Sequence, residues 1–301
     1  MTNTERQDVY TRITEQIIRS LEQGVRPWIQ PWNNEHAAGP ITRPLRYTGQ
    51  PYSGINILML WASAATQGFT APIWMTFRQA VELNAHVRKG ERGSLVVYAN
   101  SVTKTESDPD GNEVERAIRF LKAYTVFNVE QIDGLPEIYY TRPEPRFSVA
   151  ERITHAEKFF ANTGARIRYA GNRAYYAMDG DYIQMPPFEA FSDAVSFYDT
   201  LGHECAHWTK HPSRLNRDLG VRSWGDEGYS REELVAELSS AFLAADLELT
   251  PQIRDDHAAY IGSWIKVLKN DPHAIFFAAA QAQQAVDFLH RLQHPKVEAA
   301  A

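Results

Sequence analysis

Apolar residues recur three and four positions apart in several stretches of the chain, which is the spacing of one face of an α-helix. This pattern predicts helices over residues 12–21, 55–65, 76–83, 149–163, 230–249 and 256–269. A last long helix starts at Asp271-Pro272 and runs to about Leu292. Thr76 is the expected N-cap of its helix, because a threonine side chain can accept a bond from the first turn.

Two kinds of β-structure are expected between these helices. Residues 95–100 and 120–128 have the composition of strands, and Asp108-Pro109-Asp110-Gly111 between them is a strong turn signal. Residues 94–128 are therefore predicted to form a long hairpin with an acidic tip. Residues 166–185 are expected to form a three-stranded meander, with turns at Gly171-Asn172 and Asp179-Gly180. An edge strand of such a small sheet can hold an extended peptide.

The order of elements predicts an α+β chain with two domains. Residues 1–142 form the first, and the proline-containing segment 143–147 is the natural linker. Residues 148–294 form the second domain, and the alanine-ended residues 295–301 are expected to be a disordered tail.

The candidate chemistry centres on His203-Glu204-Cys205-Ala206-His207. The apolar stripe of Tyr198, Leu201, Cys205 and Trp208 makes this segment an amphipathic helix, capped by Ser192 or Asp193 and stopped at His211-Pro212. Histidines four residues apart share one face, so His203 and His207 can bind one metal ion while Glu204 takes a proton from water. The alternative is a pair of surface histidines beside a salt-bridging glutamate.

A third ligand is expected from the helix at residues 230–249. Glu233 and Glu237 lie on one face of it beside the small residues Ser240 and Ala244, which allow a close approach of the histidine helix. We assign Glu233 to the metal and Glu237 to the orientation of a histidine. The alternative is that Ser230 and Glu233 form a capping box, in which case Glu237 is the ligand.

Five segments carry a resemblance to a known family. They are LGHECAHWTKHPSRL at 201–215, REELVAEL at 231–238, YSGINIL at 52–58, VRKGERG at 87–93 and LKAYTVFN at 121–128. Together they resemble the ArdC-type antirestriction proteins of conjugative plasmids over nearly the whole chain. The resemblance implies an N-terminal single-stranded DNA-binding domain, related to the N-terminal part of TraC primases, and a C-terminal zincin-like metallopeptidase domain.

The same resemblance places the metal ligands on His203 and His207 and the catalytic glutamate on Glu204. It implies a role in protecting incoming plasmid DNA from host restriction. Gluzincin peptidases carry their third ligand in a Glu-x-x-x-Asp segment, and this chain has Glu237 where the aspartate would stand.

Composition adds three expectations. No apolar run approaches the roughly 18 residues of a membrane span and the first ten residues are polar, so we expect no membrane partner and a cytoplasmic location. Cys205 is the only cysteine, which excludes an internal disulfide and fits a reducing compartment. A small buried filler is the favoured role for Cys205, with a metal ligand or nucleophile as the alternative.

The charge is uneven along the chain. Residues 1–147 hold 16 basic and 16 acidic residues, whereas the remainder holds 15 basic and 21 acidic ones. Within the first part, residues 43–104 carry seven basic residues against two acidic ones, a modest signal for a polyanion site. The expected DNA contacts are Arg43, Arg46, Tyr47, Arg88, Lys89 and Arg92, the alternative being a solvated basic turn.

Two functions compete on this sequence. In the first, the protein binds single-stranded DNA and is a working metallopeptidase, with Zn²⁺, or Mn²⁺ or Co²⁺ in its place, and with a protein substrate such as a host restriction component. Tyr229 and His211 are then candidates for stabilising the oxyanion. In the second, the protein coats single strands, and its metal-bound domain is a scaffold or docking module.

Overall fold

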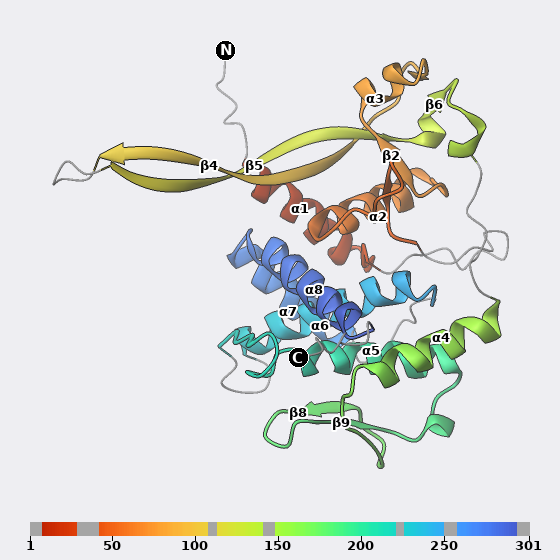
Figure 1. The fold of residues 1–301 in the computed structure, drawn as a ribbon, viewed down its shortest axis with the longest axis vertical. Helices are drawn as coiled ribbons and strands as arrows, with labels where there is room; N and C mark the ends of the chain where they lie inside the picture. The colour runs from red at the N-terminus through yellow and green to blue at the C-terminus, as the bar shows by residue number, and fades with distance from the viewer. Residues whose placement is uncertain are drawn as a thin grey trace, which may run out of the picture.

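The structure is a computed structural model that describes residues 8–28, 42–107, 113–140, 148–220, 226–249 and 258–293. Its elements alternate between helices and short sheets, so the predicted α+β class is confirmed. Figure 1 shows a long hairpin above a group of helices, with a small sheet at the opposite end of the molecule. None of the helices in the described segments combines the length and apolar character needed to cross a bilayer.

The first sheet holds four strands in the order β1-β2-β5-β4. They are β1 (Leu45–Arg46), β2 (Ile73–Met75), β4 (Ser94–Ser107) and β5 (Glu113–Asn128). Strands β4 and β5 pair antiparallel from Ser94↔Val126 to Ser107↔Glu113, which confirms the predicted hairpin. The acidic tip of that hairpin lies outside the described residues.

Helix α2 (Ile55–Gln67) fixes this hairpin from below. The buried amide of Asn56 donates to the Val97 carbonyl at 2.9 Å and accepts from the Val97 N–H at 2.8 Å. One side chain thus takes both hydrogen-bonding groups of a strand residue, as a neighbouring strand would. This contact explains the asparagine at the start of an otherwise apolar helix.

A small lobe sits at one end of the hairpin. It contains α3 (Phe77–Glu82), β3 (His86–Val87), β6 (Ile132–Asp133) and the 3-10 helices η1 (Val129–Gln131) and η2 (Glu137–Tyr139). Thr76 caps α3 as predicted, accepting from the Gln79 N–H in a capping box. Strands β3 and β6 pair antiparallel around a separate apolar cluster.

The second half opens with α4 (Val149–Asn162) and a three-stranded sheet. The strands β7 (Ile167–Tyr169), β8 (Tyr175–Ala177) and β9 (Tyr182–Met185) have the order β7-β9-β8, with β7 parallel to β9. The predicted meander is therefore wrong. Five residues separate β7 from β8, whereas a tight hairpin between adjacent strands has a loop of two residues. The longer connection crosses one end of the sheet and leaves the position between β7 and β8 to β9.

Four helices complete the fold after the short helix η3 (Phe188–Ala190). They are α5 (Ala194–Trp208), α6 (Glu227–Asp246), α7 (Ala258–Asn270) and α8 (Ala274–Arg291). Helix α6 contacts α5, α7 and α8, so it is buried on nearly all sides, which explains its lack of a single apolar stripe. Its N-cap is Asp226, one turn before the start expected at residue 230.

The two halves share one hydrophobic core. A single buried cluster joins Ile13 of α1 (Val9–Glu22), Leu58 of α2, Phe242 of α6 and Leu268 of α7. The Thr14 hydroxyl of α1 also donates to the Pro272 carbonyl at 2.6 Å. The expected linker at residues 143–147 and the expected tail at 295–301 lie outside the described residues, so the proposed domain division remains a prediction.

Candidate metal centre

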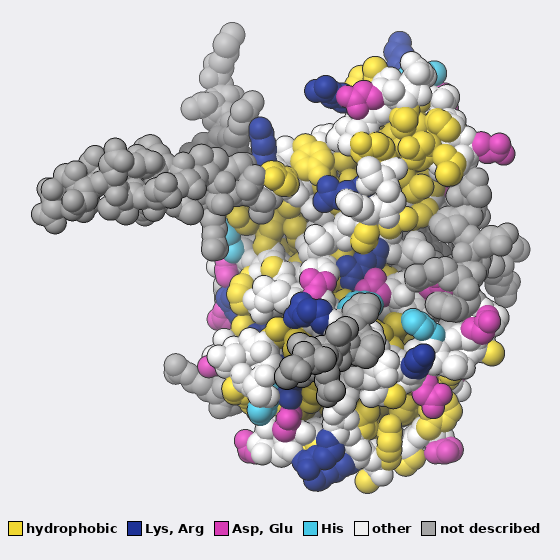
Figure 2. Space-filling model, viewed as in Figure 1, with side chains coloured by type: hydrophobic (Ala, Val, Ile, Leu, Met, Phe, Trp, Pro, Cys, Tyr) yellow, Lys and Arg dark blue, Asp and Glu magenta, His cyan; other side chains and the backbone are white. Residues whose placement is uncertain are grey.

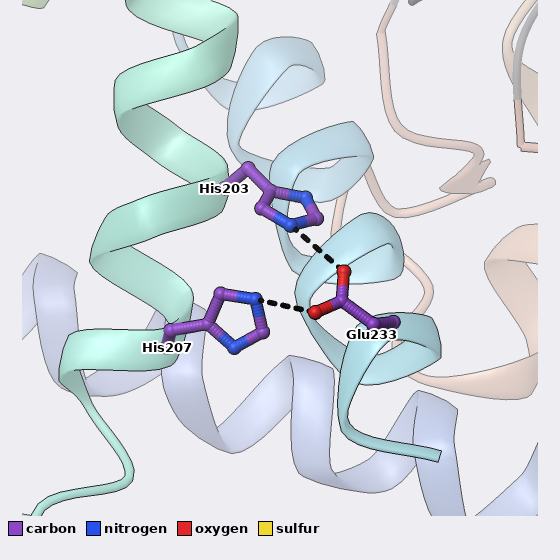
Figure 3. Close-up of side chains that lie close together, drawn as sticks. All are labelled: His203, His207 and Glu233. Carbon is purple, nitrogen blue, oxygen red and sulfur yellow. Dashed lines mark ion pairs between the residues drawn. The ribbon is translucent and has the colours of Figure 1, made fainter. Parts of the chain in front are cut away.

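Helix α5 presents both histidines of the motif to α6. Asp193 starts the helix by accepting from the Ser196 N–H at 2.7 Å, in agreement with the prediction of Ser192 or Asp193 as the cap. His203 and His207 follow one turn apart on the face opposite Leu201, with their ring centroids 4.9 Å from each other. Figure 3 shows the two rings directed toward the same carboxylate on the neighbouring helix.

That carboxylate belongs to Glu233. Its Oε2 lies 3.4 Å from His203 Nε2, and its Oε1 lies 3.5 Å from His207 Nε2. One ligand atom from each of the three side chains lies within 4.8 Å of the others, and all three residues are buried. Zinc bonds of about 2.0–2.2 Å at tetrahedral angles separate neighbouring donor atoms by about 3.3–3.6 Å. The donor set and its spacing therefore fit a divalent cation held by two imidazoles and one carboxylate.

The start of α6 removes the competing role for Glu233. Because Asp226 caps the helix and accepts from the Tyr229 N–H at 2.7 Å, Ser230 lies within the helix and forms no capping box with Glu233. The Glu233 side chain is thereby left to face the histidines.

The role expected for Glu237 is wrong. Its Oε1 accepts a hydrogen bond from the Trp28 indole at 3.1 Å and lies 3.4 Å from the Arg26 guanidinium. Glu237 thus ties the segment after α1 to α6, one turn beyond Glu233, instead of orienting a histidine. Spacing along α6 placed the two glutamates on one face, but it gave no information on what the N-terminal segment would bring against that face.

Glu232 is the residue that orients the histidine, and sequence reasoning missed it. Its Oε1 lies 3.0 Å from His207 Nδ1, the ring nitrogen that points away from Glu233. Arg217 holds the same carboxylate through two bonds of 2.9 Å, and it also donates to the Ala206 carbonyl and the Thr209 hydroxyl. A carboxylate behind a metal-binding histidine fixes the tautomer and the direction of the ring.

The charges in this cluster stabilise one another. Burial raises the pKa of Glu233, but the field of His207 and the contact with His203 outweigh it, so the pKa is lowered overall. Burial lowers the pKa of His207, yet Glu233 and Glu232 together raise it to about 9. Burial likewise opposes ionisation of Glu232, and His207 and Arg217 bring its pKa down to about 2. Both carboxylates are therefore ionised at neutral pH.

Three further side chains of the motif region have defined places. Glu204 follows His203 in α5 and is buried, with 5% of its surface exposed. Tyr229 lies beside Glu233 at the start of α6, and its hydroxyl is 3.0 Å from the Tyr260 hydroxyl. His211 lies beyond the end of α5, where its Nδ1 is 2.7 Å from the Ser213 hydroxyl. Of Tyr229 and His211, Tyr229 is thus the one that lies next to a candidate metal ligand.

Cys205 points away from this cluster into the core. Its side chain is fully buried, and this burial raises the pKa of the thiol. The sulfur is not among the atoms that converge at the site in the described chain. These observations favour the role of a small apolar filler.

The predicted DNA contacts fall into two groups. Arg43 is buried, forms an ion pair with Asp246 at 2.6 Å and donates to Gln283 at 3.0 Å. This guanidinium joins the N-terminal half to α6 and α8, so its assignment to DNA does not agree with the structure. Tyr47 is half-buried against the small apolar cluster of the lobe.

The remaining four basic residues are exposed. Arg46 lies over the Tyr52 ring at 5.0 Å from its centroid. Arg88, Lys89 and Arg92 occupy the turn after β3, where Arg88 is engaged by Glu91 at 2.8 Å and Asp133 at 3.4 Å. Gly93 ends this turn close to β5, since a Cβ there would meet the Thr125 side chain.

Known proteins resemble the chain over both halves. Residues 7–127 match the N-terminal domain of the anti-restriction factor ArdC, and residues 154–281 match the zincin-like metallopeptidase family. The uncharacterized protein y4eC of Sinorhizobium fredii is 44% identical over 293 residues, which cover 95% of this chain and 92% of that protein. The DNA primase TraC of Escherichia coli is 39% identical over 305 residues, but they span only 28% of the primase.

Two solved structures share the fold. The metal-free crystal structure of the antirestriction ArdC protein from plasmid R388 is 43% identical and superposes with a TM-score of 0.80, covering 95% of this chain and 98% of that one. Its Mn(II)-bound structure superposes with a TM-score of 0.77, covering 96% and 99%.

Proposed function

Because the chain belongs to the ArdC-type antirestriction proteins, we propose that it binds single-stranded DNA and protects incoming plasmid DNA from host restriction. We further propose that its second half is a working metallopeptidase that cleaves a host protein. The identity of the N-terminal family and the likeness to TraC support the first part. The convergence of His203, His207 and Glu233 is the observation that carries the second part.

Each residue of the site has its own role in the proposed peptide hydrolysis. His203, His207 and Glu233 hold a divalent cation, which we expect to be zinc, while the Mn(II)-bound relative supports manganese as the alternative. When bound, such an ion polarises a substrate carbonyl and lowers the pKa of water. Glu204 takes the proton of the attacking water and returns it to the leaving amine. Glu232 and Arg217 keep the His207 ring in its direction.

Tyr229 is placed to stabilise the oxyanion that forms on the substrate carbonyl. It lies beside Glu233, and burial, the Tyr260 hydroxyl and the Glu233 charge raise its pKa. The phenol therefore keeps its proton at neutral pH and can donate it in a hydrogen bond to a developing oxyanion. His211 is the weaker candidate, because its Nδ1 is engaged by Ser213 outside the ligand cluster.

A second function is favoured by the burial of the site. The exposed fractions of His203, His207 and Glu233 are 5%, 7% and 8%, and the neighbouring Glu237 is bound by Arg26 and Trp28 of the N-terminal half. A metal at this position would join α5 to α6, one helical turn from the contact of Glu237 with Arg26 and Trp28. In this account the ion stabilises a DNA-coating protein and no peptide is cleaved.

Plasmid transfer separates the two accounts. Glu204→Gln keeps the size of the side chain and removes the base. Because Glu204 is not among the three proposed ligands, the metal content measured by mass spectrometry should equal that of the parent protein. If the peptidase is required, transfer of an unmodified plasmid into a restricting recipient falls to the level seen without the protein. Glu227→Gln, an exposed change at the start of α6, is the matched control. Full protection by Glu204→Gln would leave the scaffold account standing.

A further inference from the structure

A second concave site lies on the side of α5 that faces away from the histidines. A cavity of about 640 Å³ opens between α4, β7, the η3 segment and the first half of α5. Leu201 lines it, and at 100° per residue His203 and His207 lie about 120–160° around the helix from Leu201. The cavity is therefore separate from the candidate metal centre.

The wall of this cavity is aromatic and acidic. Two carboxylates, Glu157 of α4 and Glu189 of η3, stand at its exposed rim, and the described side chains that line it include no basic residue. Figure 2 shows hydrophobic side chains beside acidic ones in the part of this face where α4 and the small sheet lie. Five rings contribute to the lining: Phe160, Tyr169, Phe188, Phe197 and Tyr198.

The rings are held in place by one another. Phe160 stacks on Tyr198 with centroids 5.9 Å apart, and Phe188 meets Phe197 edge-on at 5.1 Å. Burial raises the pKa of Tyr198 to about 12, and the negative charge of Glu157 on the same cavity wall contributes to this increase. Aromatic faces and carboxylates both attract a cation, and the faces also accept the apolar stem of a Lys or Arg side chain.

Within the described residues, the cavity adjoins an unpaired edge of a sheet. Strand β7 is the outer strand of the order β7-β9-β8, and Ile167 and Tyr169 of β7 both line the cavity. The Arg166 carbonyl and the Ala170 N–H bond to β9. By the alternation of a strand, the backbone groups of Ile167 and Tyr169 then point off the edge, where an added strand would bond.

We propose that this cavity binds a Lys or Arg side chain of an extended segment of a partner protein, which adds as a strand to β7. The acidic excess of the second half of the chain favours a basic partner segment. A nucleotide of a DNA strand is a poorer occupant despite the aromatic wall, because Glu157 and Glu189 would repel its phosphate. The site is an anchoring point beyond the proposed metal centre and does not depend on cleavage.

Peptide binding to the full chain tests this. The probe is a fluorescein-labelled decapeptide of alternating Thr and Val with one central Arg, compared by fluorescence anisotropy with the same peptide carrying Gln in its place. The double variant Glu157→Gln/Glu189→Gln should bind the Arg peptide about tenfold more weakly and leave the Gln peptide unchanged. Phe188→Ala, at a ring that is 46% exposed, should weaken the Arg peptide about fivefold.

The control is the double variant Glu82→Gln/Glu227→Gln, which removes two exposed charges far from the cavity and should bind as the parent does. EDTA should leave binding unchanged, since the cavity is separate from the histidines. Absence of saturable binding, equal binding of both peptides, or an equal loss in the control overturns the proposal. Weaker oligo-dT binding or a smaller sedimenting species in the Glu157→Gln/Glu189→Gln protein would assign the cavity to DNA or to a second copy and overturn it too.

Discussion

The Trp28 indole donates to Glu237 Oε1 at 3.1 Å across 209 residues of sequence. Arg26 reaches the same oxygen at 3.4 Å, and all three side chains are more than 90% buried. This junction lies one helical turn from Glu233, so the segment that follows α1 meets α6 beside the candidate metal centre. The two halves are therefore connected at the helix that carries Glu233, the candidate third ligand, and the connection can be tested by substitution.

The first prediction concerns Glu237→Gln. The change keeps the side-chain size but leaves the buried charge of Arg26 without its partner carboxylate, so the free energy of unfolding should fall by about 3 kcal/mol. Metal affinity should change little, whereas Glu233→Gln should reduce it by about 100-fold or more. Urea unfolding of the metal-free protein and titration with Co²⁺ provide the two measurements.

Glu227→Gln is the control for this pair, because its ion pair with Arg231 is exposed and contributes at most about 1 kcal/mol. If Glu237→Gln lost the metal while Glu233→Gln retained it, the ligand assignment would have to be exchanged.

The second prediction concerns Glu232→Gln. Without this carboxylate, His207 loses the group that fixes its tautomer, so metal affinity should fall by about 10–100-fold. The absorption bands of bound Co²⁺ should broaden or shift, because the imidazole is no longer held in one direction. Arg217→Lys keeps a positive charge but removes the two-pronged contact, and it should produce a smaller change of the same sign. Unaltered affinity and spectra in Glu232→Gln would show that the ring is held by α5 alone.

The sequence predicted the parts of the centre that depend on local spacing. The interval between His203 and His207 predicts a shared face of one helix, and the interval between Glu233 and Glu237 does the same for α6. The strand composition of residues 95–100 and 120–128, with the turn signal between them, also predicted the long hairpin. All of these follow from residues that lie close together in the sequence.

The remaining parts depend on contacts between distant segments. Nothing in the spacing of α6 indicated that Arg26 and Trp28 would take Glu237, or that Arg217 would turn Glu232 toward His207. The order β7-β9-β8 was missed for a similar reason, since turn residues mark where a strand ends but not which neighbour it pairs with. The basic stretch predicts a DNA contact for Arg43, because the sequence gives no sign that this side chain is buried against Asp246.

The third prediction is a pH dependence of stability at the end of α5. Arg214 donates to Asp181 at 3.0 Å, lies over the Trp208 ring and holds the Trp208 carbonyl at 2.7 Å. The hydrogen bond from Arg214 lowers the pKa of Asp181 from 3.8 to about 2 despite partial burial. A folded-state pKa below the unfolded one stabilises the fold above pH 4, and that contribution is lost as the pH falls toward 2.

Asp181→Asn measures this contribution. Asparagine tolerates the positive φ of 44° at this position, so the backbone need not change. Because the Asp181 side chain is 40% exposed, solvent screening keeps the expected loss of unfolding free energy at pH 7 to about 1 kcal/mol or less. The difference between parent and variant should shrink between pH 4 and pH 2. A difference that is constant over this range would attribute the effect to packing and not to the charge.

The last prediction separates Arg43 from the exposed basic residues of the N-terminal half. Lys89 and Arg92 lie in the exposed turn after β3, so they can reach phosphates without any change in the fold. Lys89→Ala/Arg92→Ala should weaken oligo-dT binding and reduce the slope of log K against log salt concentration by about 1.4, which corresponds to two phosphate contacts on a single strand. Its unfolding free energy should equal that of the parent protein.

Arg43→Ala should show the opposite pattern, with a lower unfolding free energy and an unchanged salt slope while the protein stays folded. The reason is that the change leaves Asp246 without its guanidinium partner. Arg12→Ala/Arg78→Ala, which removes two exposed charges outside this turn, controls for net charge. An unchanged salt slope in the Lys89 and Arg92 variant would move the DNA contact away from this turn, and a reduced slope in Arg43→Ala would mean that the junction with α6 opens when DNA binds.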